Sequence, residues 1–281
     1  MSDFEYYKPR SLEEVRQIKK DNPTAQYIAG GTDLLVRMKN GMVSPSALIS
    51  LRSVSELSGI VMGKTATIGS LATISQLMDH PELNNTYPVL MQAAKCLGSV
   101  QIRNVATLGG NLCNASPAAD MAPPLLVLDA AVQISDMNGS SREMPLEEFF
   151  TGPGQTKLEE NEILTDIIIP LPSPAAKAVF FRKGRVGMDL AKACLAVLIE
   201  MESDNCIKAR ISAGAVGPVP LRLKKTESKL EGKILTQDLI KEAQEIAREE
   251  IQPITDLRST EAYRQELIGV LLKRAINQLH H

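Results

Sequence analysis

Two pairs of adjacent glycines, each set among small and polar residues, most constrain what this chain can fold into. One pair lies within residues 107–120, TLGGNLCNASPAAD, which does not resemble a core segment. Gly109 and Gly110 have no Cβ and can adopt positive φ, so consecutive N–H groups can turn towards one anion. The pattern therefore predicts backbone held close to a phosphate, with additional hydrogen bonds from the side chains of Thr107, Asn111, Asn114 and Ser116 and with a carboxylate suited to ribose hydroxyls at Asp120.

The second pair lies within residues 28–35, IAGGTDLL, where a short apolar lead-in breaks at Gly30 and Gly31. This is typical of a strand that runs into a tight turn. A lone pair of glycines is usually just a turn, but two pairs separated by a subdomain's length could hold both ends of an extended phosphate ligand such as a dinucleotide. Neither segment has the glycine spacing of a Rossmann site or a P-loop, so another fold is expected.

Composition indicates an ordinary globular protein. The chain has 281 residues, 44% of them hydrophobic and 23% charged, with a formal net charge of -2. It lacks the basic excess that nucleic acid or an anionic membrane would require of a partner. The N-terminal segment has no apolar signal sequence, and no apolar run is long enough for a membrane span, so we expect a cytoplasmic protein.

Cysteine and histidine usage argues against metal chemistry in this chain. The four cysteines are widely spaced and form no Cys-x-x-Cys pair, and the three histidines are His80, His280 and His281. We therefore expect no iron–sulfur cluster, no metal site and no catalytic acid or base. Cys113 lies inside the glycine segment, where we interpret it as a small apolar filler.

Several longer motifs resemble one known family. AGGTDLL at residues 29–35 and QIRNVATLGGNLCNASPAAD at residues 101–120 resemble the two FAD-gripping segments of the FAD-binding subunit of molybdenum hydroxylases, the group that contains xanthine dehydrogenases and carbon monoxide dehydrogenases. The xanthine dehydrogenase branch is the most similar. The resemblance covers nearly the whole chain, because later family landmarks follow in order: FFTGPGQTKLEENEIL (149–164), FRKGRVGMDLAKA (181–193), GAVGPVPLR (214–222) and DLRSTEAYR (256–264).

The resemblance implies an α+β protein of two domains. The first, residues 1–172, would be a PCMH-type (vanillyl-alcohol-oxidase-like) FAD-binding domain with two subdomains. The second, residues 175–281, would be a smaller α+β domain like the carbon monoxide dehydrogenase flavoprotein C-terminal domain, with an antiparallel sheet and helices. The prolines of Leu171-Pro-Ser-Pro174 are typical of a linker at this boundary.

Local patterns predict the individual elements. Capping boxes at Ser11–Glu14 and Thr73–Gln76 begin helices, and a third helix is expected at residues 91–97. An almost unbroken apolar run at residues 125–134 indicates a buried strand. Further strands are expected near residues 27–29, 47–51, 60, 68, 163–169, 178–182, 194–201 and 207–213, and further helices from about residues 236 and 259.

The resemblance also implies a set of FAD contacts. The two glycine segments would wrap the pyrophosphate and ribityl groups, although Asp33 alternatively caps the turn. Lys183 matches an aromatic-x-Lys run, in which Phe181 stands where relatives often have Tyr. The full set is Ile28, Ala29, Gly30, Gly31, Thr32, Asp33, Leu34, Leu35, Leu97, Thr107, Leu108, Gly109, Gly110, Asn111, Asn114, Asp120, Leu164 and Lys183.

The function implied is electron transfer within a larger enzyme. In the family, a large subunit hydroxylates the substrate at a molybdopterin centre, and a small subunit with two [2Fe-2S] clusters passes the electrons to this FAD, commonly within a dimer of heterotrimers. The terminal acceptor of the purine branch is commonly NAD+, but no nicotinamide site is recognisable here, so O2 or a quinone stays open. The resemblance leaves the substrate open as well.

Three alternatives stay open at this stage. One is the medium subunit of a carbon monoxide, aldehyde or N-heterocycle dehydrogenase. Another is a self-sufficient flavin-dependent oxidoreductase of the same wider fold, as in UDP-N-acetylenolpyruvoylglucosamine reductase, which would need an acid or base that the sequence does not supply. The last is a cofactor-free scaffold, against which the four intact motif glycines argue.

Overall fold

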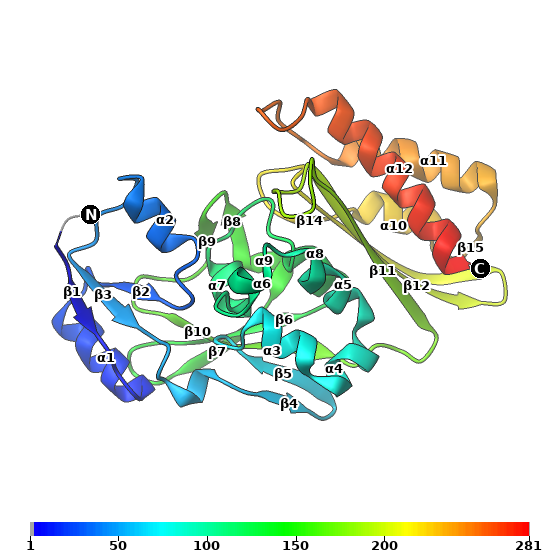
Figure 1. Cartoon of the computed structure of the whole chain (residues 1–281). Coiled ribbons are helices and arrows are strands. Elements are labelled where there is room, and N and C mark those ends of the chain that lie inside the picture. Colours follow the sequence, from blue (N-terminus) through cyan, green and yellow to red (C-terminus); the bar gives the residue numbers. More distant parts are fainter. Residues whose placement is uncertain (1–2, 281) are drawn as a thin grey trace.

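Four sheets organise the described part of the chain, residues 3–280 of this computed structural model (Figure 1). His281 lies outside this range. The N-terminal lobe contains a small parallel sheet, a five-stranded antiparallel sheet and a two-stranded hairpin, and the C-terminal lobe contains the fourth sheet with its helices. Within residues 3–280, no helix is both long and apolar enough to cross a membrane.

The parallel sheet has the strand order β1-β3-β2 and carries the first glycine segment at its edge. One short helix connects its first two strands in the chain, and a second short helix connects the second strand to the third. The predicted capping box at the start of α1 forms only in part, because the Ser11 hydroxyl accepts from the N–H of Glu14 while the Glu14 carboxylate accepts from the N–H of Arg10. The elements are β1 (Glu5–Tyr7), α1 (Leu12–Asp21), β2 (Gln26–Ile28), α2 (Leu34–Lys39) and β3 (Ala47–Ser50).

The five-stranded antiparallel sheet has the order β4-β5-β10-β6-β7, and short helices pack on it. The capping box of Thr73 and Gln76 is confirmed, with both reciprocal hydrogen bonds present. The elements are η1 (Ser55–Leu57), β4 (Ile60–Met62), β5 (Thr65–Gly69), α3 (Ile74–Asp79), α4 (Pro81–Thr86), α5 (Pro88–Cys96), α6 (Val100–Arg103), α7 (Leu108–Cys113), α8 (Ala122–Val127), β6 (Ala131–Ser135), β7 (Ser141–Pro145), α9 (Leu146–Phe149), β8 (Phe150–Gly152), β9 (Gln155–Thr156) and β10 (Ile163–Pro170).

The prediction of one buried strand at residues 125–134 is wrong. The run is a helix, α8, followed by a turn at Asp129 with φ 52° and then β6. Pro123 and Pro124 occupy the first helical positions, where the missing N–H is not needed, so they start the helix. All of α8 is buried, and a fully buried helix shows no polar face, so periodicity does not separate it from a strand.

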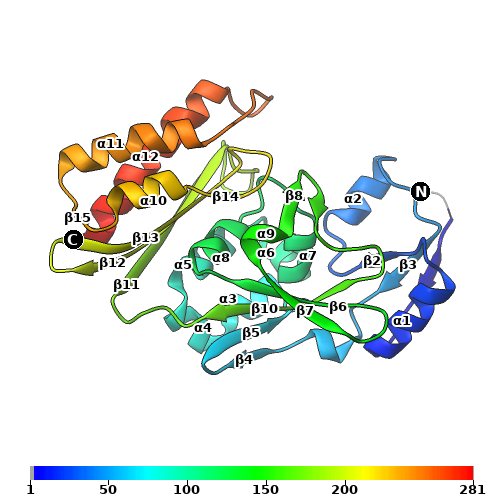
Figure 2. The ribbon, with the colours of Figure 1, turned by 180° about the vertical axis from the view of Figure 1, so that it is seen from behind.

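The C-terminal sheet has the order β11-β12-β13-β14, with β15 paired to β13, and is packed on both faces. Along β12, Cys194, Ala196 and Leu198 belong to the core of the N-terminal lobe, whereas the alternating residues Leu195, Val197 and Ile199 pack under the helices, which cover the outer face (Figure 2). The elements are β11 (Ala176–Lys183), β12 (Ala193–Glu202), β13 (Asn205–Gly214), β14 (Leu221–Arg222), α10 (Lys224–Leu230), β15 (Lys233–Ile234), α11 (Gln237–Glu250) and α12 (Glu261–His280).

The two lobes meet along β11, which follows β10 through the proline-rich segment. Helix α5 of the N-terminal lobe lies against β11, and the Gln92 side-chain oxygen accepts a 2.7 Å hydrogen bond from the N–H of Phe180. The edge strand of the C-terminal sheet is therefore capped by the other lobe, so the last residues of β11 and the loop that follows them lie at the junction.

Candidate functional site

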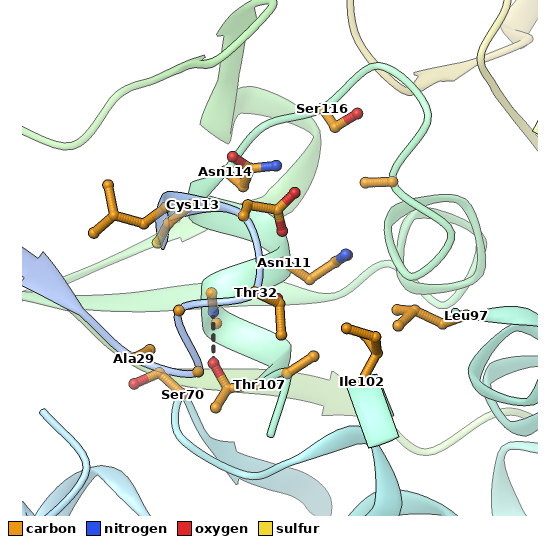
Figure 3. Close-up of a pocket in the computed structure, with 18 of the residues that line it drawn as sticks. Ala29, Thr32, Ser70, Leu97, Ile102, Thr107, Asn111, Cys113, Asn114 and Ser116 are labelled. Atoms are coloured by element: carbon orange, nitrogen blue, oxygen red, sulfur yellow. Dashed lines mark hydrogen bonds between the residues drawn. The ribbon is translucent and has the colours of Figure 1, made fainter. Parts of the chain in front are cut away.

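A cavity of about 480 Å³ lies where the two glycine segments, β10 and the loop after β11 come together (Figure 3). This volume is within the range of small-molecule sites, roughly 300–1,000 Å³. The cavity draws residues from all three large parts of the molecule: the parallel sheet, the helices over the antiparallel sheet, and the C-terminal lobe.

The first glycine segment presents a row of unpaired backbone donors. Among the described residues, no backbone or side-chain acceptor receives the N–H groups of Gly30, Gly31, Thr32 and Asp33, which precede α2 and line the cavity. Gly31 has φ 76°, which redirects its N–H relative to those of its neighbours. Successive free N–H groups at a turn bind anions, so residues 30–33 could hold a phosphate.

Gly30 is required because another chain segment touches it. A Cβ on Gly30 would lie 2.0 Å from the carbonyl oxygen of Val105, and backbone cannot yield as a flexible side chain would. The first glycine loop can therefore lie directly against the segment that leads into α7. This contact brings the two glycine segments to the same cavity.

The second glycine segment works differently from the prediction. Gly109 and Gly110 lie inside α7 and do not have positive φ. Their N–H groups are already used, since Gly109 donates to the carbonyl of Ser70 and Gly110 donates to the Thr107 hydroxyl over 3.0 Å (Figure 3). The prediction that these two N–H groups bind an anion is therefore wrong. Glycine is needed for close packing, because a Cβ on Gly109 would lie 2.5 Å from the Cβ of Ser70.

Polar side chains follow the second segment into the cavity. Asn111 extends towards the open space between α7 and the side chains of Leu97 and Ile102 (Figure 3). Its Oδ1 atom is buried and has no hydrogen-bond partner in residues 3–280. A buried polar atom left unpaired costs free energy, so this oxygen is suited to a ligand that supplies a donor.

A buried ion pair closes the far side of the cavity. Arg182 Nε lies 2.8 Å from Asp120 Oδ1, and both side chains are almost fully buried. Burial raises the pKa of Asp120 to about 6, and the Arg182 guanidinium opposes that rise. Above this pH, Asp120 is a carboxylate that could accept a hydrogen bond from a ligand hydroxyl.

The remaining walls are largely apolar and rigidly supported. Leu97 and Leu164 are buried, and the carbonyl of Leu97 accepts from the Arg103 guanidinium. Cys113 also lines the cavity, and burial raises the pKa of its thiol to about 12, so the sulfur is neutral. Glu162 is paired with Arg142 at 2.7 Å, and hydrogen bonding to that arginine lowers the pKa of Glu162.

Most of the residues predicted from the sequence line this cavity, and three do not. Leu35 is an exposed residue of α2, Leu108 is the fully buried first residue of α7, and Lys183 lies on the opposite face of β11 from Arg182. Asp33 is the N-cap residue of α2 but makes no side-chain cap bond. The predicted residues in the cavity are Ile28, Ala29, Gly30, Gly31, Thr32, Asp33, Leu34, Leu97, Thr107, Gly109, Gly110, Asn111, Asn114, Asp120 and Leu164.

The sequence did not indicate several further lining residues. Arg182 stands beside the predicted Lys183, and β-strand alternation, which puts adjacent residues on opposite faces, was the signal that could have separated them. Met188, Asp189 and Leu190 come from the loop after β11, whose approach to the cavity depends on how the two lobes pack. Tyr27 also lines the cavity, and its buried hydroxyl has no partner in the described residues.

The cofactor that the resemblance implies fits this set of residues. The free N–H row of residues 30–33 suits a pyrophosphate, while the Asn111 oxygen and the Asp120 carboxylate suit hydroxyl or amide donors. The apolar walls suit an aromatic ring system, and Gly30 and Gly109 let the two segments pack closely against Val105 and Ser70 around the cavity. Together they match an extended, doubly charged ligand with a flat ring, as FAD is.

Comparisons with known proteins agree with this fit. Residues 2–172 match the family described as FAD binding domain in molybdopterin dehydrogenase, and residues 179–279 match the CO dehydrogenase flavoprotein C-terminal domain. The chain is 31% identical to the xanthine dehydrogenase FAD-binding subunit of Escherichia coli O157:H7, over 99% of this chain and 97% of that protein. It is 32% identical to the nicotinate dehydrogenase FAD-subunit of Eubacterium barkeri, over 98% and 95%.

Solved structures give the same result. Carbon monoxide dehydrogenase from Hydrogenophaga pseudoflava superposes with a TM-score of 0.95 at 30% identity, covering 98% of this chain and 96% of that one. The predicted α+β fold, with an FAD-binding domain followed by a flavoprotein C-terminal domain, is confirmed. The chain therefore belongs to the FAD-binding subunits of molybdenum hydroxylases, the family of xanthine dehydrogenase and carbon monoxide dehydrogenase, and is an FAD-dependent oxidoreductase subunit.

Proposed function

We propose that this chain is the electron-transfer subunit of a xanthine dehydrogenase-like molybdenum hydroxylase. Electrons would pass from a large molybdopterin subunit to a small [2Fe-2S] subunit and then to this chain. This chain would deliver them to a terminal acceptor such as NAD+. The observation that carries the proposal is one cavity in which a row of free N–H groups, a buried unpaired amide oxygen and apolar walls converge. Bound FAD would supply the redox chemistry.

The residues of the chain would bind, orient and enclose this cofactor. The N–H groups of residues 30–33 would hold the pyrophosphate, and Asn111 and Asp120 would hold polar groups at fixed positions. Leu97, Ile102 and Leu164 would exclude water from the ring system. Leu35 and Leu108 would support the two glycine segments from outside the cavity, and a direct role for Lys183 stays a prediction.

The proposed partners and domain limits rest on the relatives. Their names describe subunits or medium chains of dehydrogenases for xanthine, nicotinate and carbon monoxide. Because similar chains serve different substrates, we propose that a partner subunit binds the hydroxylated substrate and that this substrate does not enter the cavity of this chain. We further propose a dimer of heterotrimers in the cytoplasm, with domains at residues 1–172 and 175–281; the four free thiols fit a reducing compartment.

An absorption spectrum tests the cofactor and its role. The purified full chain is desalted after incubation with FAD, reduced with dithionite and then exposed to NAD+, to air or to a quinone. Retained flavin bands that bleach and recover support the proposal, and the reagent that restores them identifies the acceptor. A chain that retains no flavin under any condition, including within the co-expressed complex, would refute it.

Co-purification tests the partners. The tagged chain is co-expressed with candidate small [2Fe-2S] and large molybdopterin subunits from the same organism, and the complex is sized by light scattering. A stable complex with about four iron atoms, from two [2Fe-2S] clusters, and one molybdenum atom per flavin subunit is expected. Recovery of the flavin-loaded chain alone, turning over a substrate without partners, would instead support the self-sufficient oxidoreductase, for which Asp120 would be the acid–base candidate because its pKa is about 6.

A further inference from the structure

Arg182 occupies the junction between the FAD cavity and the C-terminal lobe, and all three of its guanidinium nitrogens are engaged. Nε donates to Asp120 Oδ1 over 2.8 Å, Nη1 donates to the carbonyl of Gly187 over 3.3 Å, and Nη2 donates to the carbonyl of Asp189. The Arg182 side chain is 6% exposed. One planar cation thus joins a cavity carboxylate to the backbone of the loop at residues 184–190.

The loop at residues 184–190 forms one wall of the cavity but has little packing of its own. Met188, Asp189 and Leu190 line the cavity, yet Val186 is 69% exposed and Met188 is 70% exposed. Within the loop, Arg185 pairs with Asp189 at 2.6 Å, a contact exposed on the arginine side. Segments with few buried apolar contacts open easily, so the two bonds from Arg182 are a main restraint on this wall.

Asp120 has one oxygen to spare. Oδ1 accepts from Arg182, while Oδ2 accepts from no residue among those described, and Asp120 lines the cavity. A carboxylate can accept several hydrogen bonds, and the charge-assisted bond from the buried Arg182 Nε to Oδ1 restrains the orientation of the group.

We propose that Arg182 is a positioning residue for FAD: its guanidinium fixes the Asp120 carboxylate so that Oδ2 accepts from a cofactor hydroxyl, and it holds the loop at residues 184–190 against the cofactor. The inference rests on the proposed FAD site. Arginine suits this task because it presents donors in three directions in one plane, whereas lysine presents a single charged point.

The electrostatics support the same arrangement. Burial raises the pKa of Asp120 to about 6, and the arginine charge and hydrogen bond hold it down. Without Arg182, the carboxyl would stay protonated to a higher pH, and a protonated carboxyl is a poorer acceptor for a hydroxyl.

The test compares Arg182→Gln and Arg182→Lys with wild type in the full chain. Lys177→Gln is the matched control, since it removes an exposed cation from the same strand. FAD affinity is measured by flavin fluorescence between pH 5 and pH 9, and tryptic cleavage after Arg185 is followed by mass spectrometry with and without FAD. Circular dichroism and thermal melting confirm that each variant folds.

Three results are expected. Arg182→Gln should weaken FAD binding about tenfold at pH 7.5 and move the pH at which affinity falls upward. Arg182→Lys should restore the pH profile, because it keeps the charge, but only part of the affinity, because one ammonium group cannot also hold the loop at residues 184–190. Both variants should be cleaved faster after Arg185 than wild type, and Lys177→Gln should match wild type throughout.

Each contrary result is decisive. If Arg182→Gln binds FAD with wild-type affinity and pH profile, this inference fails while the proposed site stands. A uniform loss at every pH that Arg182→Lys does not restore would show a merely structural role and would also overturn it. If Arg182→Gln does not fold, Arg182→Lys is compared with wild type instead. Cleavage of Arg182→Lys after Arg185 at the wild-type rate would then overturn the inference. Failure of wild type itself to bind FAD would refute the proposed site and this inference with it.

Discussion

The Thr107 hydroxyl accepts a 3.0 Å hydrogen bond from the N–H of Gly110, and a Cβ on Gly110 would lie 2.7 Å from that hydroxyl oxygen. The bond satisfies a donor in the first turn of α7 and closes the helix N-terminus beside the cavity. The same contact leaves no room for a side chain at residue 110. The contact between Thr107 and Gly110 therefore both caps the helix and requires glycine beside the cofactor site.

Gly110→Val should abolish FAD retention. The valine would displace the Thr107 hydroxyl and occupy space beside Ala29, at a cost of roughly 1–3 kcal/mol of folding stability from overpacking and about 1 kcal/mol from the lost cap. Flavin content after desalting and the urea unfolding midpoint report the two effects. Gly63→Val is the control, because a Cβ there would meet only the Thr65 carbonyl oxygen at 3.8 Å, an ordinary contact, and Gly63 does not line the cavity. Normal flavin content in Gly110→Val would refute the placement of the site.

Much of the fold could be predicted because local signals agree with the tertiary structure. The Thr73 cap, the β-branched strand that ends at Pro170 and the helix that follows Thr236 all have short-range causes. The run at residues 125–134 was misread because burial on all sides removes the polar face that distinguishes a helix. Two adjacent prolines, read as the first turn of a helix, were the available signal.

The site could be located from the sequence, but the role of each glycine could not. Gly31 does adopt positive φ, whereas Gly109 is helical and is constrained by Ser70, a residue 39 positions earlier. Such a contact depends on tertiary packing and leaves no local trace. Strand alternation separates Arg182 from Lys183, but only tertiary packing shows that Arg182 meets Asp120 of the other lobe. The assignment of Lys183 stays a prediction.

Asn111→Leu should change apo stability and FAD affinity in opposite senses. The buried Oδ1 of Asn111 has no partner in the described residues, and an unsatisfied buried polar atom costs roughly 1–3 kcal/mol. Leucine removes that cost, so the apo variant should be at least as stable as apo wild type in urea. Its FAD affinity should fall about tenfold, because the hydrogen bond to the cofactor is lost.

Asn111→Asp gives the matched comparison, since it keeps an oxygen at nearly the same position and removes the amide donor. An Asn111→Leu variant that is less stable without FAD but binds FAD normally would contradict both expectations. That result would show that the Asn111 amide has a purely structural role.

Cys113→Ala should be tolerated. The thiol lines the cavity, but burial raises its pKa to about 12, so it stays neutral and unreactive near pH 8. Flavin content should equal that of wild type, and iodoacetamide should modify Cys113 only after unfolding, as peptide mass spectrometry would show. Flavin loss in Cys113→Ala would mean that the sulfur makes a contact that alanine cannot replace.

Lowering the pH through about 6 should weaken FAD binding. It should also raise the free energy of unfolding of the apo chain, because the buried Asp120 carboxylate becomes protonated. The folded pKa of Asp120 is raised from 3.8 to about 6 by burial, against the opposing effect of Arg182. A raised carboxyl pKa favours the protonated folded state, so this stability contribution is complete below about pH 4 and is lost as the pH rises to about 6. FAD needs the ionised acceptor, so its affinity should rise over the same interval.

Asp120→Asn isolates both effects, because asparagine does not titrate. The stability difference between wild type and Asp120→Asn, measured in urea without FAD, should move against wild type between pH 4 and pH 6 and stay constant above that. FAD affinity of wild type should fall by up to tenfold per pH unit below its midpoint, while that of Asp120→Asn should show a smaller dependence. Because FAD binding favours the carboxylate, the midpoint in the complex should lie below that of the apo chain. Parallel pH profiles for the two proteins would remove Asp120 from the site.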